Sequence, residues 1–192
     1  MTLTNTLRIA GLSTLILAFA GIAAAQGPVA DSPTTSAELE MSAEVQTALQ
    51  LNISTGVGGA TVTGSNATGL FAINFGIVNG LGLGTPTAGV TASIDGTGTT
   101  YTTPINLTPV YSGFTTETAD VTVEEGASAD QPIAREGATA GGVVAVTTPV
   151  AVFSSAASES LNERFVGFRI ARTEAAGAKV ATLIYTVTMA ID

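Results

Sequence analysis

The chain has 192 residues, a formal charge of −9 at neutral pH, and no cysteine, histidine or tryptophan. Catalysis of the serine–histidine or cysteine–histidine type is therefore excluded, and a zinc site would lack its commonest ligands. The negative charge also makes the chain a poor partner for nucleic acid or an anionic membrane surface. We predict a protein that is not an enzyme and that holds no cofactor or metal ion.

The first 25 residues have the layout of a secretory signal peptide. Arg8 precedes an apolar run over residues 9–22, and three alanines offer a cleavage site before Gln26. The run is short for a membrane span, so an uncleaved anchor is the less favoured alternative. Cleavage removes Arg8 and no acid, which changes the formal charge from −9 to −10. We expect a secreted or cell-surface protein without a membrane span after cleavage.

Residues 26–37 are polar and contain proline, which indicates a flexible N-terminal arm. The next stretch, residues 38–54, alternates between apolar odd and polar even positions, which is the period of a β-strand. At roughly 3.3 Å per residue it would extend about 55 Å, far more than a typical strand. Either the stretch bends near Gln46–Thr47 into two strands, or its first half reaches beyond its own domain.

Glycine-rich turns separate the segments that follow. Residues 60–63 are a short predicted strand, and residues 90–94 alternate before an Asp95-Gly96 turn. Between them, residues 70–78 carry apolar side chains on one face, so we predict a central strand of the core. The four residues of that face are Phe71, Ile73, Phe75 and Ile77.

Residues 101–111 contain two prolines, Pro104 and Pro109. Because proline has no amide donor for a ladder, we expect this strand to be short or at the edge of a sheet. Residues 119–123 alternate as in a half-exposed strand. Residues 125–142 are rich in glycine, alanine and charge, which predicts an exposed loop.

The chain ends in further apolar segments, at residues 143–146, 150–153, 166–170 and 180–191. About nine or ten strands with turn signals between them, and no long helix, predict an all-β fold. We expect a single Ig-like or pilin-like β-sandwich over residues 38–192. The order of its strands does not follow from the pattern.

Three candidate sites have simpler explanations. Six acids could bind calcium or include a glycosidase pair, but their spacing fits no calcium loop and a solvated acidic face explains them. Residues 79–86 lack the spacing and the following helix of a phosphate-binding loop, so we interpret them as a turn. Sequons at Asn52, Asn66 and Asn106 matter only in a host that glycosylates such sites. The acids are Glu117, Asp120, Glu124, Glu125, Asp130 and Glu136.

The few cations are unevenly distributed. Four of the five that remain after cleavage lie near the C-terminus, whereas the arm and the first strand carry only acids. The N-terminal strand could pair with C-terminal strands within one molecule, which we favour, or with those of the next molecule. The cations are Arg164, Arg169, Arg172 and Lys179, and the acids are Asp31, Glu38, Glu40 and Glu44.

Three features resemble secreted pilin-like sandwiches of the spore-coat-U and chaperone–usher kind. They are the signal peptide, the alternating N-terminal strand followed by Ile-Asn-Phe-Gly at 73–76, and the alternating terminal strand at 183–189. The resemblance concerns the pattern of most of the mature chain, which lacks the disulfide that many members carry. In that group an N-terminal extension can complete the incomplete sandwich of a neighbour, so the resemblance implies β-strand addition.

We therefore expect an exported structural subunit of a filament, coat or extracellular matrix. An inserted face of Leu39, Met41, Ala43 and Val45 would propagate a homopolymer, because this head-to-tail contact does not close. The four C-terminal cations would lie at the subunit contact. The resemblance also allows an export chaperone as a partner. The alternative is a monomeric secreted binding module or adhesin that uses the loop at 79–86 or 125–142.

Overall fold

The computed structural model has an all-β fold. It describes residues 41–44, 46–114, 116–127 and 134–190. Outside these ranges lie the expected signal peptide (1–25), the N-terminal arm (26–37), and the candidate residues Leu39, Val45 and Asp130. Backbone contacts separate Met1–Ser42 from Ala43–Asp192, and the architecture that follows is that of the second unit. No helix in the described ranges is long and apolar enough to span a membrane.

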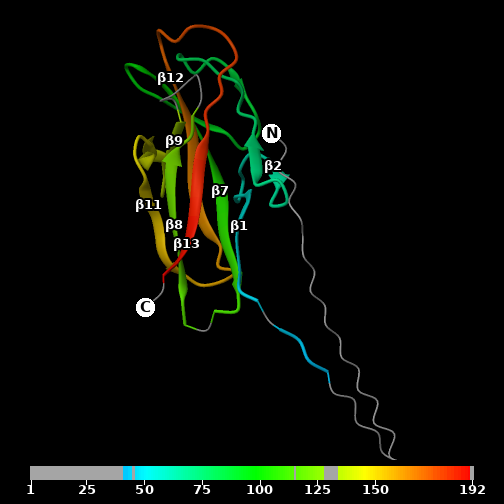
Figure 1. Ribbon diagram of the computed structural model, residues 1–192. Coiled ribbons are helices and arrows are strands. Elements are labelled where there is room, and N and C mark those ends of the chain that lie inside the picture. Colours follow the sequence, from blue (N-terminus) through cyan, green and yellow to red (C-terminus); the bar gives the residue numbers. More distant parts are fainter. Residues whose placement is uncertain (1–40, 45, 115, 128–133, 191–192) are drawn as a thin grey trace, which may run out of the picture. The chain divides into compact units, whose positions relative to one another are not determined.

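The larger of the two main sheets has six antiparallel strands (Figure 1). Five of them follow the order β1-β7-β12-β9-β10. The sixth, β6, pairs with the first part of β7, on the edge that β1 occupies further along. Their bounds are β1 Ala48–Thr55, β6 Thr91–Ile94, β7 Gly98–Ser112, β9 Ala134–Gly137, β10 Val144–Ala145 and β12 Asn162–Ala171.

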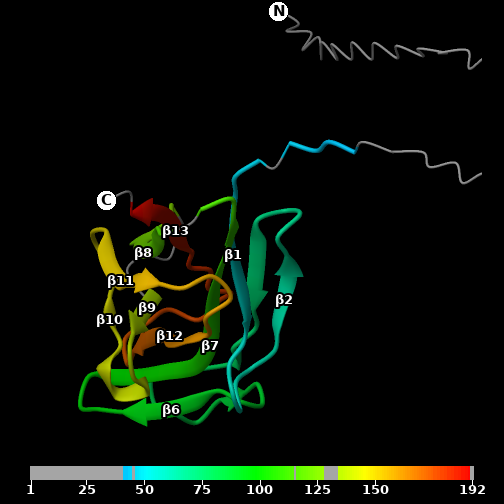
Figure 2. The same cartoon turned by 90° about the horizontal axis from the view of Figure 1, so that it is seen from below.

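The smaller main sheet has three antiparallel strands in the order β11-β8-β13, and it faces the larger sheet (Figure 2). Two hairpins, β2-β3 and β4-β5, complete the fold, and a short 3-10 turn precedes β10. This is the expected β-sandwich class, with thirteen strands among the described residues rather than nine or ten. The remaining bounds are β2 Val62–Ser65, β3 Leu70–Ile73, β4 Gly76–Ile77, β5 Thr85–Pro86, β8 Thr118–Glu125, η1 Ala140–Gly142, β11 Val150–Ala156 and β13 Leu183–Ala190.

The core lies between the two main sheets. On β8, the side chains of Ala119, Val121 and Val123 are at most 1% exposed. The predicted alternation is therefore confirmed, and β8 is the middle strand of its sheet. The larger sheet supplies the other layer of the core, with Tyr101, Ile105 and Leu107 from β7 and Val166 and Ile170 from β12.

Residues 101–111 lie in the longest strand, so the expectation of a short or edge strand is wrong. β7 has 15 residues and carries neighbours on both edges. The amide and carbonyl of one residue face the same edge of a strand. Pro104 accepts a hydrogen bond from Gly56, so its missing donor faces the junction between β1 and β6. Pro109 accepts one from Glu159 at 2.7 Å, so its missing donor faces the other edge, where β12 has ended.

Residues 70–78 form two short strands, β3 and β4, instead of one central strand. Between them, Asn74 Oδ1 accepts a hydrogen bond from the amide of Gly76 at 2.8 Å, and Gly76 has a φ of +78°. This local turn interrupts the extended backbone. Phe75 is consequently buried in the core, whereas Ile77 is 72% exposed.

Residues 134–137 form a buried strand, β9, within the region expected to be an exposed loop. Glu136 on this strand is only 4% exposed, because Arg164 of β12 compensates its charge. The two residues are 28 positions apart, so nothing near Glu136 in the sequence indicates its partner. The charge-rich pattern was therefore misleading at this strand.

Candidate functional site

The outer edge of β13 has no strand beside it in the part of the chain that the structure describes. The inner edge pairs with β8, and Gly126 N donates to Thr182 O at 2.9 Å at the start of that ladder. Because backbone groups alternate between the two edges of a strand, the odd residues of β13 turn their N–H and C=O groups outward. These residues are Leu183, Tyr185, Val187 and Met189. The edge is thus an open template for another strand.

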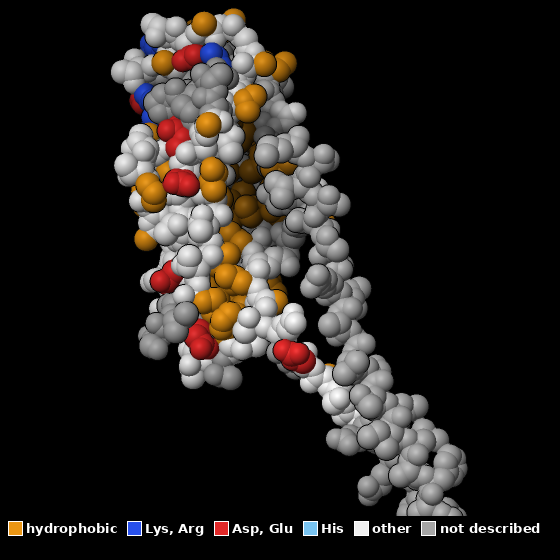
Figure 3. Space-filling view, in the orientation of Figure 1, with side chains coloured by type: hydrophobic (Ala, Val, Ile, Leu, Met, Phe, Trp, Pro, Cys, Tyr) orange, Lys and Arg blue, Asp and Glu red, His pale blue; other side chains and the backbone are white. Residues whose placement is uncertain are grey.

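An apolar groove with a volume of about 720 Å³ lies beside the beginning of this edge, at residues 183–185. One wall is formed by residues 179–185, and the other by the β2-β3 hairpin and the middle of β1. The floor comes from the larger sheet. Figure 3 shows hydrophobic side chains along this hollow. The apolar residues that line it include Leu51, Ile53, Val62, Phe71, Ile73, Ile105, Val166, Phe168 and Leu183.

The groove continues into a second hollow of about 910 Å³ at the end of the sandwich where β12 ends. The two hollows share Ile73, Phe75, Phe168 and Lys179. At this junction the rings of Phe75 and Phe168 meet edge to face, with their centroids 4.9 Å apart. The outer part of the second hollow is lined by Arg172 and residues 174–179, which we call the mouth of the groove.

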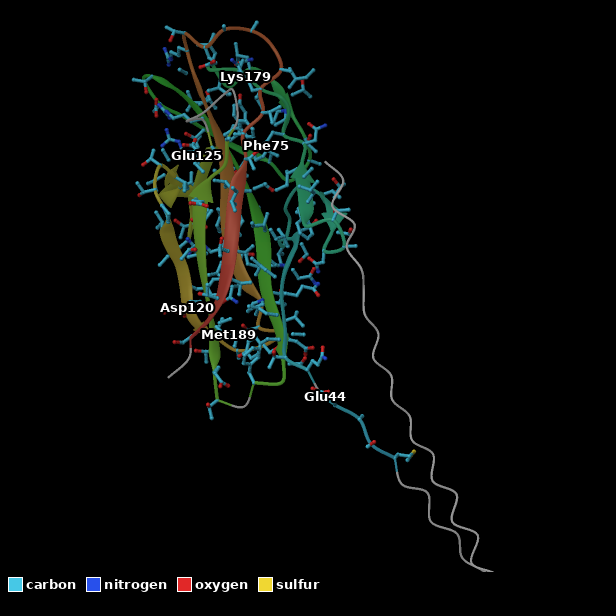
Figure 4. All side chains as sticks on the ribbon, in the orientation of Figure 1. Glu44, Phe75, Asp120, Glu125, Lys179 and Met189 are labelled. Atoms are coloured by element: carbon cyan, nitrogen blue, oxygen red, sulfur yellow. The ribbon has the colours of Figure 1, made fainter. Side chains whose placement is uncertain are left out.

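The mouth and the start of β1 lie at opposite ends of the sandwich. Ala171, just before the mouth, pairs with the first residue of β7, whereas Ala48 pairs with the last. The 15 residues of β7 span about 50 Å at roughly 3.3 Å each. Figure 4 shows Lys179 and Glu44 at these two ends. The chain therefore enters its own sandwich far from the mouth.

Tyr185 is one of the polar residues that line the groove. The hydroxyl oxygen of Tyr185 is buried and has no hydrogen-bond partner among the described residues. Burial raises the pKa of Tyr185 well above its usual range, the charge of Glu136 raises it further, and that of Arg164 lowers it. An unpaired buried hydroxyl is unfavourable for the stability of the fold.

The four C-terminal cations are spread over the larger sheet and the mouth, and each interacts within its own domain. Arg164 pairs with Glu136 inside the sandwich. Arg169 pairs with Asp95 at 2.8 Å, and its hydrogen bond holds the pKa of that carboxyl far below its usual range. At the mouth, Lys179 pairs with Glu174 at 2.7 Å, and Arg172 donates to the carbonyl of Asp95 at 3.2 Å. A role of these cations at a subunit contact stays a prediction.

The predicted N-terminal strand is divided in the structure. β1 begins only at Ala48 and pairs with β7 rather than with a C-terminal strand. Before it, residues 41–44 and 46–47 belong to no strand. Met41 is 85% exposed, and Ala43 is exposed as well. Half of the proposed inserted face is therefore accessible, and its other half lies outside the described ranges.

The remaining candidates have structural explanations. Among the described residues no three acids are grouped so as to hold a metal ion. Asn79 Oδ1 accepts hydrogen bonds from the amides of Leu81 and Leu83, so the glycine-rich loop is a turn built on this side chain. Of the sequon residues, Asn66 donates to Asn52 at 2.7 Å and Asn106 donates to Thr55 O at 3.2 Å.

No family model, curated protein or solved structure matches the chain. The site therefore rests on geometry alone. Sequence reasoning missed the groove because its lining comes from six separate segments. The sequence signal that could have indicated the groove is the long alternating strand at the C-terminus, because an alternating pattern does not tell which strands lie beside it.

Proposed function

We propose that the protein is an exported structural subunit that builds a filament, coat or extracellular matrix by strand addition between copies. Residues 38–46 of one copy would lie along the outer edge of β13 of the next. The observation that carries this proposal is the open edge of β13 beside an apolar groove. An added strand bonds through its backbone and fills pockets with alternate side chains. The apolar face for those pockets is Leu39, Met41, Ala43 and Val45.

The positions of the two ends support a direction for the added strand. The segment leaves its own sandwich at Ala48, opposite to the mouth. If copies stack head to tail, the segment lies in the next copy with residue 46 at the mouth and residue 38 deepest. It then runs antiparallel to β13. Each copy donates at one end and accepts at the other, so the contact propagates instead of closing.

The length of the segment also fits. Residues 38–46 extend about 30 Å at roughly 3.3 Å per residue. β13 has eight residues, about 26 Å by the same rise. One segment therefore covers the open edge once, and Thr47 joins it to β1 of its own copy.

Negative-stain microscopy of residues 26–192 beside residues 47–192 tests the proposal. The shorter chain keeps all thirteen strands of the structure, so it should fold and remain as single particles. The longer chain should form filaments or sheets. Single folded particles in both preparations would overturn the proposal.

A substitution pair separates insertion from other effects of the segment. Met41→Asp with Val45→Asp places two charges in the groove and should abolish assembly. Ser42→Asp places a charge on the opposite face of the same segment and should leave assembly intact. Equal assembly by both variants would contradict insertion of the apolar face.

A second candidate function is that of a monomeric binding module or adhesin. It is favoured by exposed apolar side chains on and beside the loop at 79–86, where Leu83 is 80% exposed. These exposed side chains are those of Ile77, Leu81, Leu83 and Ile94. Exposed apolar patches mark interaction sites more often than isolated exposed residues do. Gel filtration distinguishes the two functions, because this one requires a stable monomer with residues 26–46 present.

A further inference from the structure

We infer that the cations of the mouth, Lys179 and Arg172, set the direction and register of the incoming segment by pairing with its acids, above all Glu44. This inference rests on the proposed strand addition. It assigns a specificity role to the rim of the groove, whereas the groove itself supplies apolar contact. The partner is the segment 38–46 of a second copy of this chain.

The distribution of charge along the chain supports this assignment. No lysine or arginine occurs between Arg8 and Arg135, so the segment and its surroundings carry only acids. The acids of the segment occupy even positions, on the face opposite the apolar one. An inserted strand would therefore place Glu44 at the surface of the groove, within reach of its rim. The three acids of this face are Glu38, Glu40 and Glu44.

The structure distinguishes the cations that could meet these acids. Arg164 is held in the sandwich by two hydrogen bonds to Glu136. Arg169 is engaged by Asp95 and by Thr100 on the larger sheet. Lys179 lines both hollows and Arg172 lines the mouth. Only these two of the four C-terminal cations lie on the path of an incoming strand.

The register follows from the point of entry. If residue 46 lies at the mouth, Glu44 is the acid of the segment nearest the mouth, and Glu38 lies about 20 Å deeper at roughly 3.3 Å per residue. A segment inserted in the opposite direction would bring Glu38 to the cations and leave Glu44 at the far end. Lys179 already pairs with Glu174, so the incoming carboxylate would join or replace that partner. Charge complementarity of this kind acts mainly on the association rate and on the choice of register.

A charge exchange in the mature chain, residues 26–192, tests the inference. Assembly is followed by light scattering at about 0.05 M salt, where charge interactions are only partly screened. Lys179→Glu and Glu44→Lys should each slow assembly roughly tenfold, and the double variant should recover most of the original rate. Raising the salt to about 0.5 M should slow the original chain and abolish the difference between the variants. Glu38→Lys in place of Glu44→Lys should fail to rescue Lys179→Glu.

Two controls keep the result interpretable. Glu174→Gln removes one partner of Lys179 but keeps the cation, so assembly should not slow. Glu163→Lys makes the same charge change on an exposed position of β12 and should not rescue Lys179→Glu. Unchanged rates in both single variants, with assembly still abolished by Met41→Asp and Val45→Asp, would overturn the inference and leave the proposed function intact. Rescue by Glu38→Lys would overturn the register.

Discussion

Arg164 on β12 donates two hydrogen bonds to Glu136 on the neighbouring strand β9, at 2.6 Å from Nε to Oε1 and 3.0 Å from Nη2 to Oε2. Both side chains are largely withdrawn from water, at 15% and 4% exposure. A planar guanidinium matches a carboxylate in this geometry, so each charge is neutralised where the sheet is covered by the second layer. Once one of these two charges is buried in the fold, the other is therefore needed to compensate it.

Removing one partner of this pair should destabilise the protein strongly. Arg164→Met leaves the buried Glu136 carboxylate uncompensated, at an expected cost of about 3–5 kcal/mol in the free energy of unfolding. The double variant Arg164→Met with Glu136→Leu should recover most of that loss, because no charge remains. Urea unfolding measures both. A loss below about 1 kcal/mol in the single variant would contradict the pairing.

The central strand β7 should not tolerate a third proline. Thr108 pairs with Asn52, and its amide faces β1, as the carbonyls of the even residues do. Thr108→Pro removes this donor and should lower the free energy of unfolding by about 3 kcal/mol. Thr108→Val keeps the donor and the size of the side chain, so it should change stability by less than about 1 kcal/mol. Similar losses in both variants would show that the ladder at this position is unimportant.

Much of the fold could be predicted from period-two patterns, and the errors have identifiable causes. Alternation placed β8, β12 and β13 correctly because their inward side chains face one core. It failed at Gly76, where a positive φ and the side chain of Asn74 interrupt an apolar run. It failed at Pro104 and Pro109 because the edge that a proline faces depends on where neighbouring strands end.

The candidate site was less predictable than the fold. The groove lies where β13 has no neighbouring strand among the described residues, and sequence patterns predict strands without their order. The apolar face of residues 39–45 could be recognised because it lies in one continuous stretch. The walls that would receive it could not, since Ile53, Ile73 and Leu183 meet only through the topology.

Two tyrosines should respond oppositely to loss of the hydroxyl. Tyr101 OH donates to Asn79 O at 2.8 Å and accepts from Asn79 N at 3.2 Å, and so holds the glycine-rich loop against the core. Tyr101→Phe leaves both backbone groups of Asn79 without this partner and should cost about 1–3 kcal/mol. Tyr185→Phe removes a buried hydroxyl that has no partner among the described residues, so it should be neutral or stabilising. Thermal or urea unfolding compares the two, and a larger loss at Tyr185 would refute this assignment.

Tyr185 should also make stability depend on alkaline pH. Its pKa is raised in the folded protein by burial, whereas in the unfolded chain it is about 10. The unfolded state therefore loses a proton first, so the contribution of Tyr185 is fully present below about pH 10 and is lost as the pH rises above that value. Unfolding measured between about pH 9 and 11 should show a steeper decline for the original chain than for Tyr185→Phe. Parallel declines would contradict a buried phenol.

If assembly proceeds by the proposed strand addition, donor and acceptor functions should be separable by mixing two variants that cannot assemble alone. Met41→Asp with Val45→Asp disables the segment but keeps the groove. Ile73→Asp places a charge where the two hollows meet and disables the groove, but it keeps the segment. In a mixture, the segment of the Ile73→Asp variant can enter the groove of the other variant. The resulting dimer has neither a functional segment nor a functional groove left, so it cannot extend further. Gel filtration should therefore show dimers in the mixture and monomers in each variant alone.

Thr63→Asp, on an exposed position of the same hairpin, should still form polymers by itself. Polymers in the mixture would mean that assembly uses a contact other than strand addition.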